Sequence, residues 1–199
     1  MSELKTPQAG DDHRSLDDDV VSLLMRQHGD IRNLFDEVEA TSGEERRDAF
    51  RRLVRLLAVH ETAEEEVVHP FVRRSVAGGQ EIVEDRLKEE REAKEILAVL
   101  DDMDPDGPDF LPKLIELRRD VQMHARAEER YEFIHIRRST DVTDLAAMAK
   151  AKAIKAAEAM APTRPHTGVE SGAKNMALGP VAALMARTKD TVRKAMGGS

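Results

Sequence analysis

Two pairs of histidine and glutamate with the same spacing are the side chains in this sequence best suited to chemistry. His60 lies four residues before Glu64, and His124 lies four residues before Glu128. On an α-helix this spacing places both side chains on one face, about 6 Å apart along the axis. Such a pair can bind one metal ion, or its carboxylate can bridge to a second ion about 3.5–4 Å away. The repeated spacing therefore predicts a metal site.

Apolar neighbours predict that both pairs are buried. Steps of three and four residues trace an apolar stripe through each pair. The first stripe is Phe50, Leu53, Leu57, His60, Glu64, Val67 and Phe71. The second is Leu114, Leu117, Val121, His124, Glu128, Tyr131 and His135. A further stripe with one histidine in its middle is Val21, Leu24, His28, Ile31, Phe35 and Val38. Burial of these imidazoles and carboxylates is unfavourable unless they are paired or bound to something.

These positions predict a dinuclear metal centre. Glu64 and Glu128 are expected to bridge two cations, and His28, His60 and His124 are expected as terminal ligands. Imidazole and carboxylate together favour iron, ahead of manganese and zinc. A single histidine on an apolar stripe can instead be a hydrogen-bonded core residue, and a single pair can be an intrahelical hydrogen bond. The two pairs together with His28 favour the metal.

Glu90 and Tyr131 each have two interpretations. Glu90 lies on the inward side of a third helical segment, where it is either a metal ligand or the ion-pair partner of Lys94 or an arginine. Tyr131 lies one turn beyond Glu128 and is the catalytic candidate, because its hydroxyl is placed to hydrogen-bond a bridging oxygen. The alternative for Tyr131 is an amphipathic core residue near the end of the helix.

His69 is expected to lie outside the centre. It follows His60 by nine residues, which is half a circumference away on a regular helix, so its side chain is expected to face outward or to cap the end of the helix. The glutamates expected on solvated faces are Glu65, Glu66, Glu89 and Glu129. The predicted metal ligands are therefore His28, His60, Glu64, Glu90, His124 and Glu128.

Four long helical segments are predicted to position these residues. Their approximate ranges are 15–40, 44–71, 80–103 and 110–137, and Pro70 is expected to kink or end the second. Aromatic residues make up 3% of the chain and charged residues 35%, which is typical of helices and unfavourable for a sheet. Short connections favour antiparallel neighbours, so the sequence predicts an all-α fold with an up-down-up-down four-helix bundle and additional C-terminal helices.

The predicted bundle domain spans residues 15–138. Residues 1–14 are expected to form a flexible N-terminus. Residues 139–199 are expected to contain an Ala-rich helix, a linker rich in proline and glycine, and an amphipathic tail. The apolar face of the tail is formed by Val181, Leu184, Met185 and Val192. Its basic residues are Arg187, Lys189, Arg193 and Lys194. Docking on the protein itself or homodimerisation is favoured over binding to an anionic membrane surface.

Composition argues against several classes of function. The chain has no cysteine, which excludes disulfides, thiolate nucleophiles and thiolate metal ligands. Its net charge of -8 argues against nucleic acid as the main partner. No apolar run approaches the ~20 residues of a membrane-spanning helix, and the polar N-terminus is unlike a signal peptide. A cytoplasmic protein is therefore expected.

The order of these residues resembles the hemerythrin-like, or HHE cation-binding, proteins. The resemblance covers about residues 16–137 and rests on His28, on the pair His60 and Glu64 followed by "HP", and on the pair His124 and Glu128. It implies a non-haem di-iron site, with two iron ions per chain, that meets dioxygen, nitric oxide or peroxide. The family usually has a histidine on the third helix, whereas the segment "LKEEREAKEIL" has none and carries Glu90 at the aligned position.

The departure at Glu90 shapes the functional expectation. A carboxylate in place of an imidazole adds negative charge, stabilises ferric over ferrous iron and weakens reversible dioxygen binding. The first expectation is therefore redox chemistry on peroxide or dioxygen, with catalase-like or oxidase-like activity. The alternatives are reversible binding or sensing of dioxygen or nitric oxide, and iron storage.

Overall fold

A computed structural model describes residues 19–138, 150–155 and 180–197 of the chain. All regular structure within these ranges is helical, and none of the described residues forms a strand. The predicted all-α class is thereby confirmed for the described part of the chain. The expected flexible N-terminus and the expected linker lie outside the described residues.

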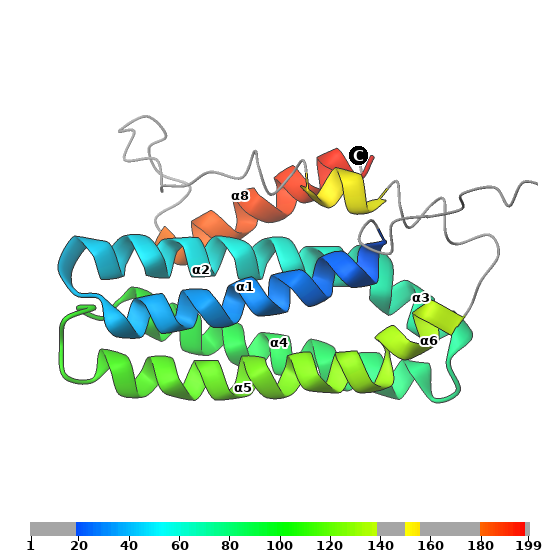
Figure 1. The fold of residues 1–199 in the computed structure, drawn as a ribbon, viewed down its shortest axis with the longest axis horizontal. Coiled ribbons are helices and arrows are strands. Elements are labelled where there is room, and N and C mark those ends of the chain that lie inside the picture. Colours follow the sequence, from blue (N-terminus) through cyan, green and yellow to red (C-terminus); the bar gives the residue numbers. More distant parts are fainter. Residues whose placement is uncertain (1–18, 139–149, 156–179, 198–199) are drawn as a thin grey trace, which may run out of the picture.

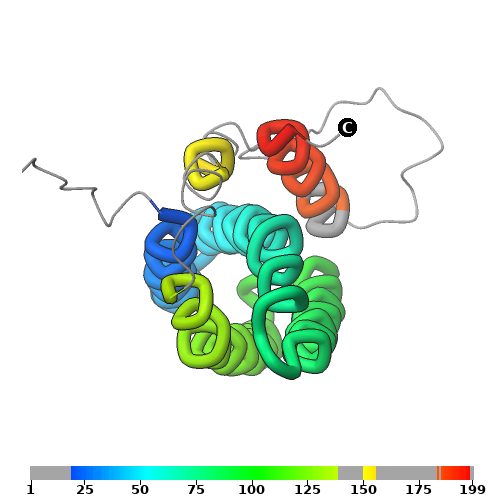
Figure 2. Tube along the Cα trace, turned by 90° about the vertical axis from the view of Figure 1, so that its right-hand side faces the viewer, coloured from blue at the N-terminus to red at the C-terminus, as the bar shows by residue number. Residues whose placement is uncertain are grey.

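Four long helices form the body of the molecule. They are α1 (Val20–Ala40), α2 (Gly43–Ala63), α4 (Gly79–Asp101) and α5 (Phe110–Tyr131). The four lie side by side, and successive ones run in opposite directions (Figure 1). A view along their length shows them arranged around a common core (Figure 2). The α1–α2 and α4–α5 connections meet at one end, where the Gly43 N–H donates to the Asp106 carboxylate at 2.9 Å.

Two apolar clusters fill the helical bundle at its two ends. One contains Ile31, Phe35, Leu57 and Leu117, and the other contains Leu24, Val59, Ala63 and Phe133. His28 follows Leu24 and precedes Ile31 on α1, so its level in the bundle is between the two clusters. Apolar packing on both sides keeps bulk water away from this level and lowers the local dielectric constant, which strengthens electrostatic interactions there.

The second helical segment continues through Pro70, which does not end it. After α2 the chain forms a π-helix, η2 (Glu64–Val68), and then α3 (His69–Ser75), with Pro70 in the first turn of α3. The His69 N–H donates to the Glu64 carbonyl, which is a bond over five residues. Proline lacks an N–H and clashes with the carbonyl four residues earlier in an α-helix, and a wider turn before it avoids both problems.

The fourth predicted segment is interrupted near its end. α5 ends at Tyr131, Glu132 has a φ of -116°, and a short helix, α6 (Phe133–Arg138), follows.

The first helix, α1, follows its N-cap residue Asp19, whose carboxylate accepts a hydrogen bond from the Ser22 N–H at 2.8 Å. This cap satisfies one of the free donors of the first turn and fixes the start of the helix.

The basic C-terminal helix, α8 (Pro180–Ala195), lies outside the four long helices and against α2 and α4 (Figure 2). This placement agrees with the predicted docking of the tail on the protein itself, while a homodimer stays a prediction. Residues 150–155 are also helical, with Ala151 and Ile154 buried against the bundle. Among the described helices, none has the length and apolar character needed to cross a membrane.

Candidate metal centre

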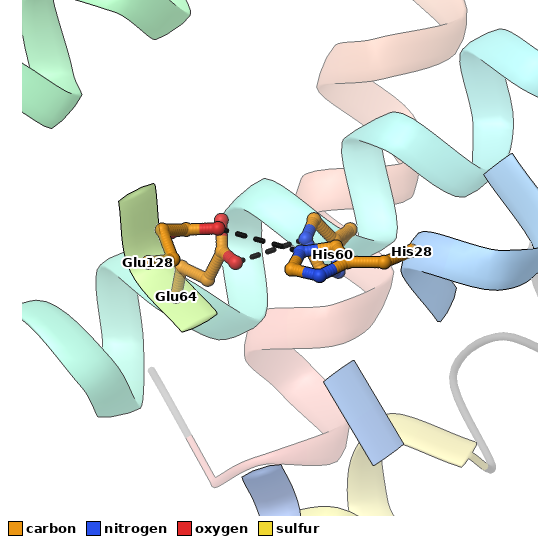
Figure 3. A group of neighbouring side chains, drawn as sticks. All are labelled: His28, His60, Glu64 and Glu128. Carbon is orange, nitrogen blue, oxygen red and sulfur yellow. Dashed lines mark ion pairs between the residues drawn. The ribbon is translucent and has the colours of Figure 1, made fainter. Parts of the chain in front are cut away.

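The predicted ligands come together in the middle of the bundle. His28 on α1, His60 on α2, Glu64 on η2 and Glu128 on α5 are all buried, and each offers a ligand atom within 4.8 Å of the others. Figure 3 shows the four side chains facing one another from these separate helices. A second group with the same spacing consists of Glu64, Glu90 and His124. Glu64 belongs to both groups, so the two groups are adjoining parts of one centre.

Glu64 and Glu128 each present their two oxygens to different imidazoles. Glu64 Oε1 lies 2.9 Å from His60 Nε2, while its Oε2 lies 3.9 Å from His124 Nε2. Glu128 Oε2 lies 3.4 Å from His28 Nε2, while its Oε1 lies 3.3 Å from His124 Nε2. None of these four carboxylate oxygens has a hydrogen-bond partner of good geometry. Two carboxylates so oriented can bridge two cations that lie between the imidazoles.

Each of the three predicted histidine ligands is oriented by a hydrogen bond at its other ring nitrogen. Nδ1 of His28 donates to Glu129 at 2.8 Å. His60 Nδ1 donates to the Gln27 side-chain oxygen at 3.0 Å. The remaining bond joins His124 Nδ1 to Glu89 at 2.9 Å. Because carboxylates and amide oxygens accept, the neutral rings carry their proton on Nδ1, and the Nε2 lone pair points into the centre. This is the arrangement that fixes the tautomer of metal-binding histidines.

The partners of these histidines correct an expectation from the sequence. Glu89 and Glu129, which were expected only on solvated faces, are 39% and 34% exposed at their side chains and also bind the rings. Their carboxylates reach inward from the rim of the helices. Gln27 is buried and was not predicted at all, because an amide beside a histidine on a helix carries no distinctive spacing.

The outward placement of His69 is wrong. This side chain is only 2% exposed, and its Nε2 lies 3.0 Å from Glu90 Oε1. The π-helix η2 places one more residue in a turn than an α-helix does, so the nine residues from His60 to His69 span about 2.2 turns instead of about 2.5, and His69 is rotated by about 100° toward the inward side. The proline directly after His69 was the signal in the sequence for this wider turn.

Glu132 is a buried carboxylate that the sequence did not single out. Its side chain is fully buried, and neither oxygen has a hydrogen-bond partner of good geometry. The nearest cationic groups are Arg86 Nε at 3.8 Å and His69 Nδ1 at 4.0 Å. The repeat of four residues from His124 through Glu128 to Glu132 was the signal that could have identified it.

The inward orientation expected for Tyr131 is wrong. Its side chain is 53% exposed, and its ring lies 5.5 Å from the Arg130 guanidinium. Three residues after Glu128 the helix has turned past the inward face, and Glu132 occupies that face instead. The hydroxyl of Tyr131 therefore has no geometric support as a catalytic group.

A comparison with family models identifies the family of this helical domain. Residues 19–136 match the family model described as the hemerythrin HHE cation-binding domain. The chain belongs to the hemerythrin HHE cation-binding family. The match includes every residue discussed above, from His28 on α1 to Glu132 at the end of α5, and the all-helical fold agrees with it.

Similarity to individual proteins is more distant. The chain is 27% identical over 122 residues to a protein from Nostoc sp. (strain PCC 7120) that is named a DNA nickase. The matched region is 61% of this chain and 34% of the relative, so the chain spans about a third of the length of that protein. No solved structure matches the chain.

The side chains of this HHE domain fit a metal centre. Buried atoms that have no hydrogen-bond partner of good geometry include His28 Nε2, His60 Nε2, both oxygens of Glu64 and both oxygens of Glu128. Buried polar atoms are normally hydrogen-bonded, and a cluster of unsatisfied ligand atoms within 4.8 Å of one another is suited to hold an ion. The donors are imidazole nitrogens and carboxylate oxygens, which suit iron, manganese and zinc.

Opposed charges in the centre shift several pKa values. Burial alone would raise the pKa of Glu64, but the neighbouring His60 and His124 outweigh it and hold this pKa well below its usual range. Burial would also lower the pKa of His124, but Glu128, Glu64 and Glu89 raise it well above its usual value. His28 and His69 follow the same pattern, since carboxylates raise their pKa against the effect of burial. The carboxylates therefore favour the protonated forms of His28, His69 and His124.

Glu90 makes the ion pair with Lys94 that one interpretation of its sequence position predicted, and it lies beside Glu64 and His124. Its Oε1 is near His69, and its Oε2 lies 3.5 Å from Lys94 Nζ. Lys94 is shared, because the same Nζ lies 3.0 Å from Glu61 Oε2. Burial raises the pKa of Glu61 to about 7 despite this lysine. Both oxygens of Glu90 therefore have a neighbour, since Oε1 is hydrogen-bonded to His69 and Oε2 faces Lys94.

A small cavity adjoins the centre. It has a volume of about 40 Å³ and is lined by His28, His60, Glu90 and His124 together with apolar residues such as Leu57. The lining also includes Arg32, which is exposed, so the cavity extends toward the surface between the helices. A space of this size admits water or a diatomic molecule but not an organic substrate.

Proposed function

We propose that this HHE domain holds two iron ions and performs redox chemistry on peroxide or dioxygen. The observation that carries the proposal is the orientation of Glu64 and Glu128, whose oxygens face separate imidazoles. His28 and His60 would hold one ion, and His124, His69 and Glu90 would hold the other. Two iron ions, when bound, supply the electrons that a reaction with peroxide or dioxygen requires.

The charge of the centre supports chemistry over reversible binding. Glu64, Glu90, Glu128 and Glu132 are all buried around it, at most 3% exposed. Carboxylates stabilise the more highly charged oxidation state of a metal and lower its reduction potential. A dioxygen carrier must return to the reduced state when the ligand leaves. The buried carboxylates oppose that return and favour the oxidised resting state.

Other groups of the chain limit what reaches the ions and supply protons. The cavity beside His28 and His60 accepts only small molecules, and the apolar clusters above and below it exclude bulk water. Glu61 lines the same cavity, and with its pKa raised to about 7 by burial its carboxyl group can hold or release a proton at neutral pH. A proton source beside the cavity suits reduction of peroxide, which consumes protons.

The test is a reaction of the iron-loaded protein with peroxide. Ferrous protein prepared without air should be oxidised by air without a stable dioxygen adduct. It should then consume added peroxide over many turnovers with release of one dioxygen per two peroxides, because without an added reductant a second peroxide must supply the electrons. Substitutions His60→Ala and His124→Ala should abolish both effects, whereas His135→Ala, at an exposed position on α6, should not. A long-lived and reversible dioxygen adduct would instead support carriage or sensing, and uptake of many iron ions per chain would support storage.

The name of the Nostoc relative does not define a second candidate. The match to that DNA nickase covers 34% of its length. This chain carries a net charge of -8, whereas a protein that binds a phosphate backbone needs a basic surface. We therefore propose a diatomic molecule or peroxide as the partner of this domain.

A further inference from the structure

We propose that α8 is a clasp that holds η2 in its π-helical form, and that Lys189 and Arg193 are positioning residues for the metal ligands at the two ends of η2. The proposal rests on metal binding by the centre but not on its redox chemistry. α8 lies on the outside of α2 (Figure 2), and its basic side chains reach η2. The centre would then depend on a helix that is remote in sequence.

The ion pairs of α8 are directed at two consecutive residues of η2. Lys189 Nζ contacts Glu65 Oε2, and Arg193 Nη2 lies 3.4 Å from the same oxygen. Arg193 Nε donates to Glu66 Oε1 at 2.9 Å. Glu65 and Glu66 were expected to be merely solvated. They instead tie the outer face of the π-helix to α8.

The segment that is tied carries ligands at both ends. Glu64 is the first residue of η2, and the His69 N–H closes the wide turn by donating to the Glu64 carbonyl. π-helices are rare and occur as single turns, because an α-helical turn is the more stable alternative. If η2 returned to the α-helical register, His69 would rotate by about 100° and leave the centre.

Repulsion within η2 explains why external cations are useful there. Glu64, Glu65 and Glu66 are consecutive, so their negative charges lie within one turn. Lys94 of α4 meets Glu65 at 3.8 Å, and α8 supplies the two further cations. Without α8, only Lys94 would offset the repulsion in this turn, which lies beside an already carboxylate-rich centre.

The interface between α8 and the bundle combines buried side chains with partly exposed ion pairs. Val192 and Thr188 of α8 are fully buried, which anchors the helix. The Arg193 and Glu66 side chains are 45% and 40% exposed, so water and salt weaken their ion pair. A cavity of about 230 Å³, lined in part by Lys94 and Lys189, lies between part of α8 and the helices α2 and α4. The interface therefore depends on its ion pairs as well as on packing.

The experiment compares Arg193→Glu with Lys194→Glu. Lys194 is the next residue, is exposed and carries the same charge, so it is a matched control. In protein loaded with Co²⁺, transfer of the metal to excess chelator should be about tenfold faster in Arg193→Glu and unchanged in Lys194→Glu. The visible spectrum of bound Co²⁺ should also change only in Arg193→Glu, since loss of His69 alters the ligand set. The double variant Glu66→Arg with Arg193→Glu restores the ion pair and should return the rate and spectrum toward those of the wild type.

A second measurement needs no metal. In the metal-free protein, amide hydrogen exchange at residues 65–69 should be faster in Arg193→Glu than in the wild type or in Lys194→Glu. Equal exchange and equal metal loss in Arg193→Glu and the wild type would overturn the clasp. Equal acceleration in both single variants would also overturn it, because net charge and not the ion pair would then be responsible. A wild-type protein that binds no Co²⁺ or iron would contradict the proposed metal centre, while the exchange data would still decide the clasp.

Discussion

The two sides of the metal centre are built differently. On one side, His28 and His60 project from uninterrupted α-helices and contact Glu128 and Glu64. On the other side, His69 reaches the centre only because a π-helix precedes it. Glu132 lies there at the break between α5 and α6. The regular side is held by the same backbone hydrogen bonds as the rest of the bundle. The irregular side depends on local backbone features that a single change can remove.

The shared carboxylates give the largest expected effect. Glu64→Ala removes a group that faces both sides, so iron content should fall from about two ions per chain to fewer than one. Glu45→Ala, at an exposed position on α2, is the control and should keep the wild-type content. Metal analysis after desalting measures both. Retention of one full ion in Glu64→Ala would show that the two sides are independent and that Glu64 does not bridge.

One substitution on each side of the centre tests whether each side holds its own ion. His28→Ala should remove the ion on the regular side, and His69→Ala should remove the ion on the irregular side, so each variant should keep about one ion. The remaining ions should differ in visible spectrum, because their ligand sets differ. Wild-type iron content and spectrum in His69→Ala would exclude this residue and reduce the irregular side to Glu90 and His124.

Regular helical geometry made the first side predictable. Steps of three and four residues placed His28, His60, Glu64 and Glu128 on inward faces, and the structure places all of them there. Glu90 was also correctly placed on the inward side. The prediction failed for His69 because it assumed an α-helix with no change of register. A π-turn contains one additional residue, which rotates the residues after it by about 100° and brings His69 to the inward side. It failed for Tyr131 because the inward face of α5 continues from Glu128 to Glu132 and not to the residue before it.

Residues that orient the ligands were also beyond sequence reasoning. Glu89, Glu129 and Gln27 meet histidines on other helices, so their roles depend on how the helices pack and not on spacing within one helix. The same is true of Glu65 and Glu66, which appear as solvated charges until α8 is placed beside them.

The pH dependence of stability gives a smaller effect. Burial raises the pKa of Glu61 and Glu132 from 4.5 to about 7, and neighbouring carboxylates raise the pKa of His28, His69 and His124. In each case the folded protein holds a proton more tightly than the unfolded chain, so stability falls as pH rises. The fall runs from about 4.5 to 7 for Glu61 and Glu132, and it continues above 6.5 for the histidines. Glu64 acts oppositely, but only below its usual pKa of 4.5.

Thermal unfolding of the metal-free protein between pH 5 and pH 8.5 measures this effect. The melting temperature should fall over that range, and saturating metal should remove most of the fall, because cations displace the protons. Metal at 100 times its dissociation constant should add about 2.7 kcal/mol to the free energy of unfolding. A melting temperature that rises with pH in the metal-free protein would mean that the buried carboxylates are not protonated there.

The smallest effect is expected at Tyr131. Because this side chain is exposed and turned away from the centre, Tyr131→Phe should leave iron content and peroxide consumption unchanged and alter stability by less than about 0.5 kcal/mol. Parallel assays of the variant and wild type check this. A large loss of activity with normal iron content would restore the tyrosine as a catalytic group. It would also require that α5 rotates when the metal binds, so that Tyr131 faces the centre.

X-ray absorption spectroscopy at the iron edge tests the central claim most directly, because it reports whether the two sides of the centre share their bridging carboxylates. In the iron-loaded wild-type protein, the account predicts an iron–iron distance of about 3.5–4 Å, with nitrogen and oxygen ligands only. That distance should be absent in Glu64→Ala. Iron-loaded wild-type protein with no iron–iron signal, or with the same signal in Glu64→Ala, would contradict the account.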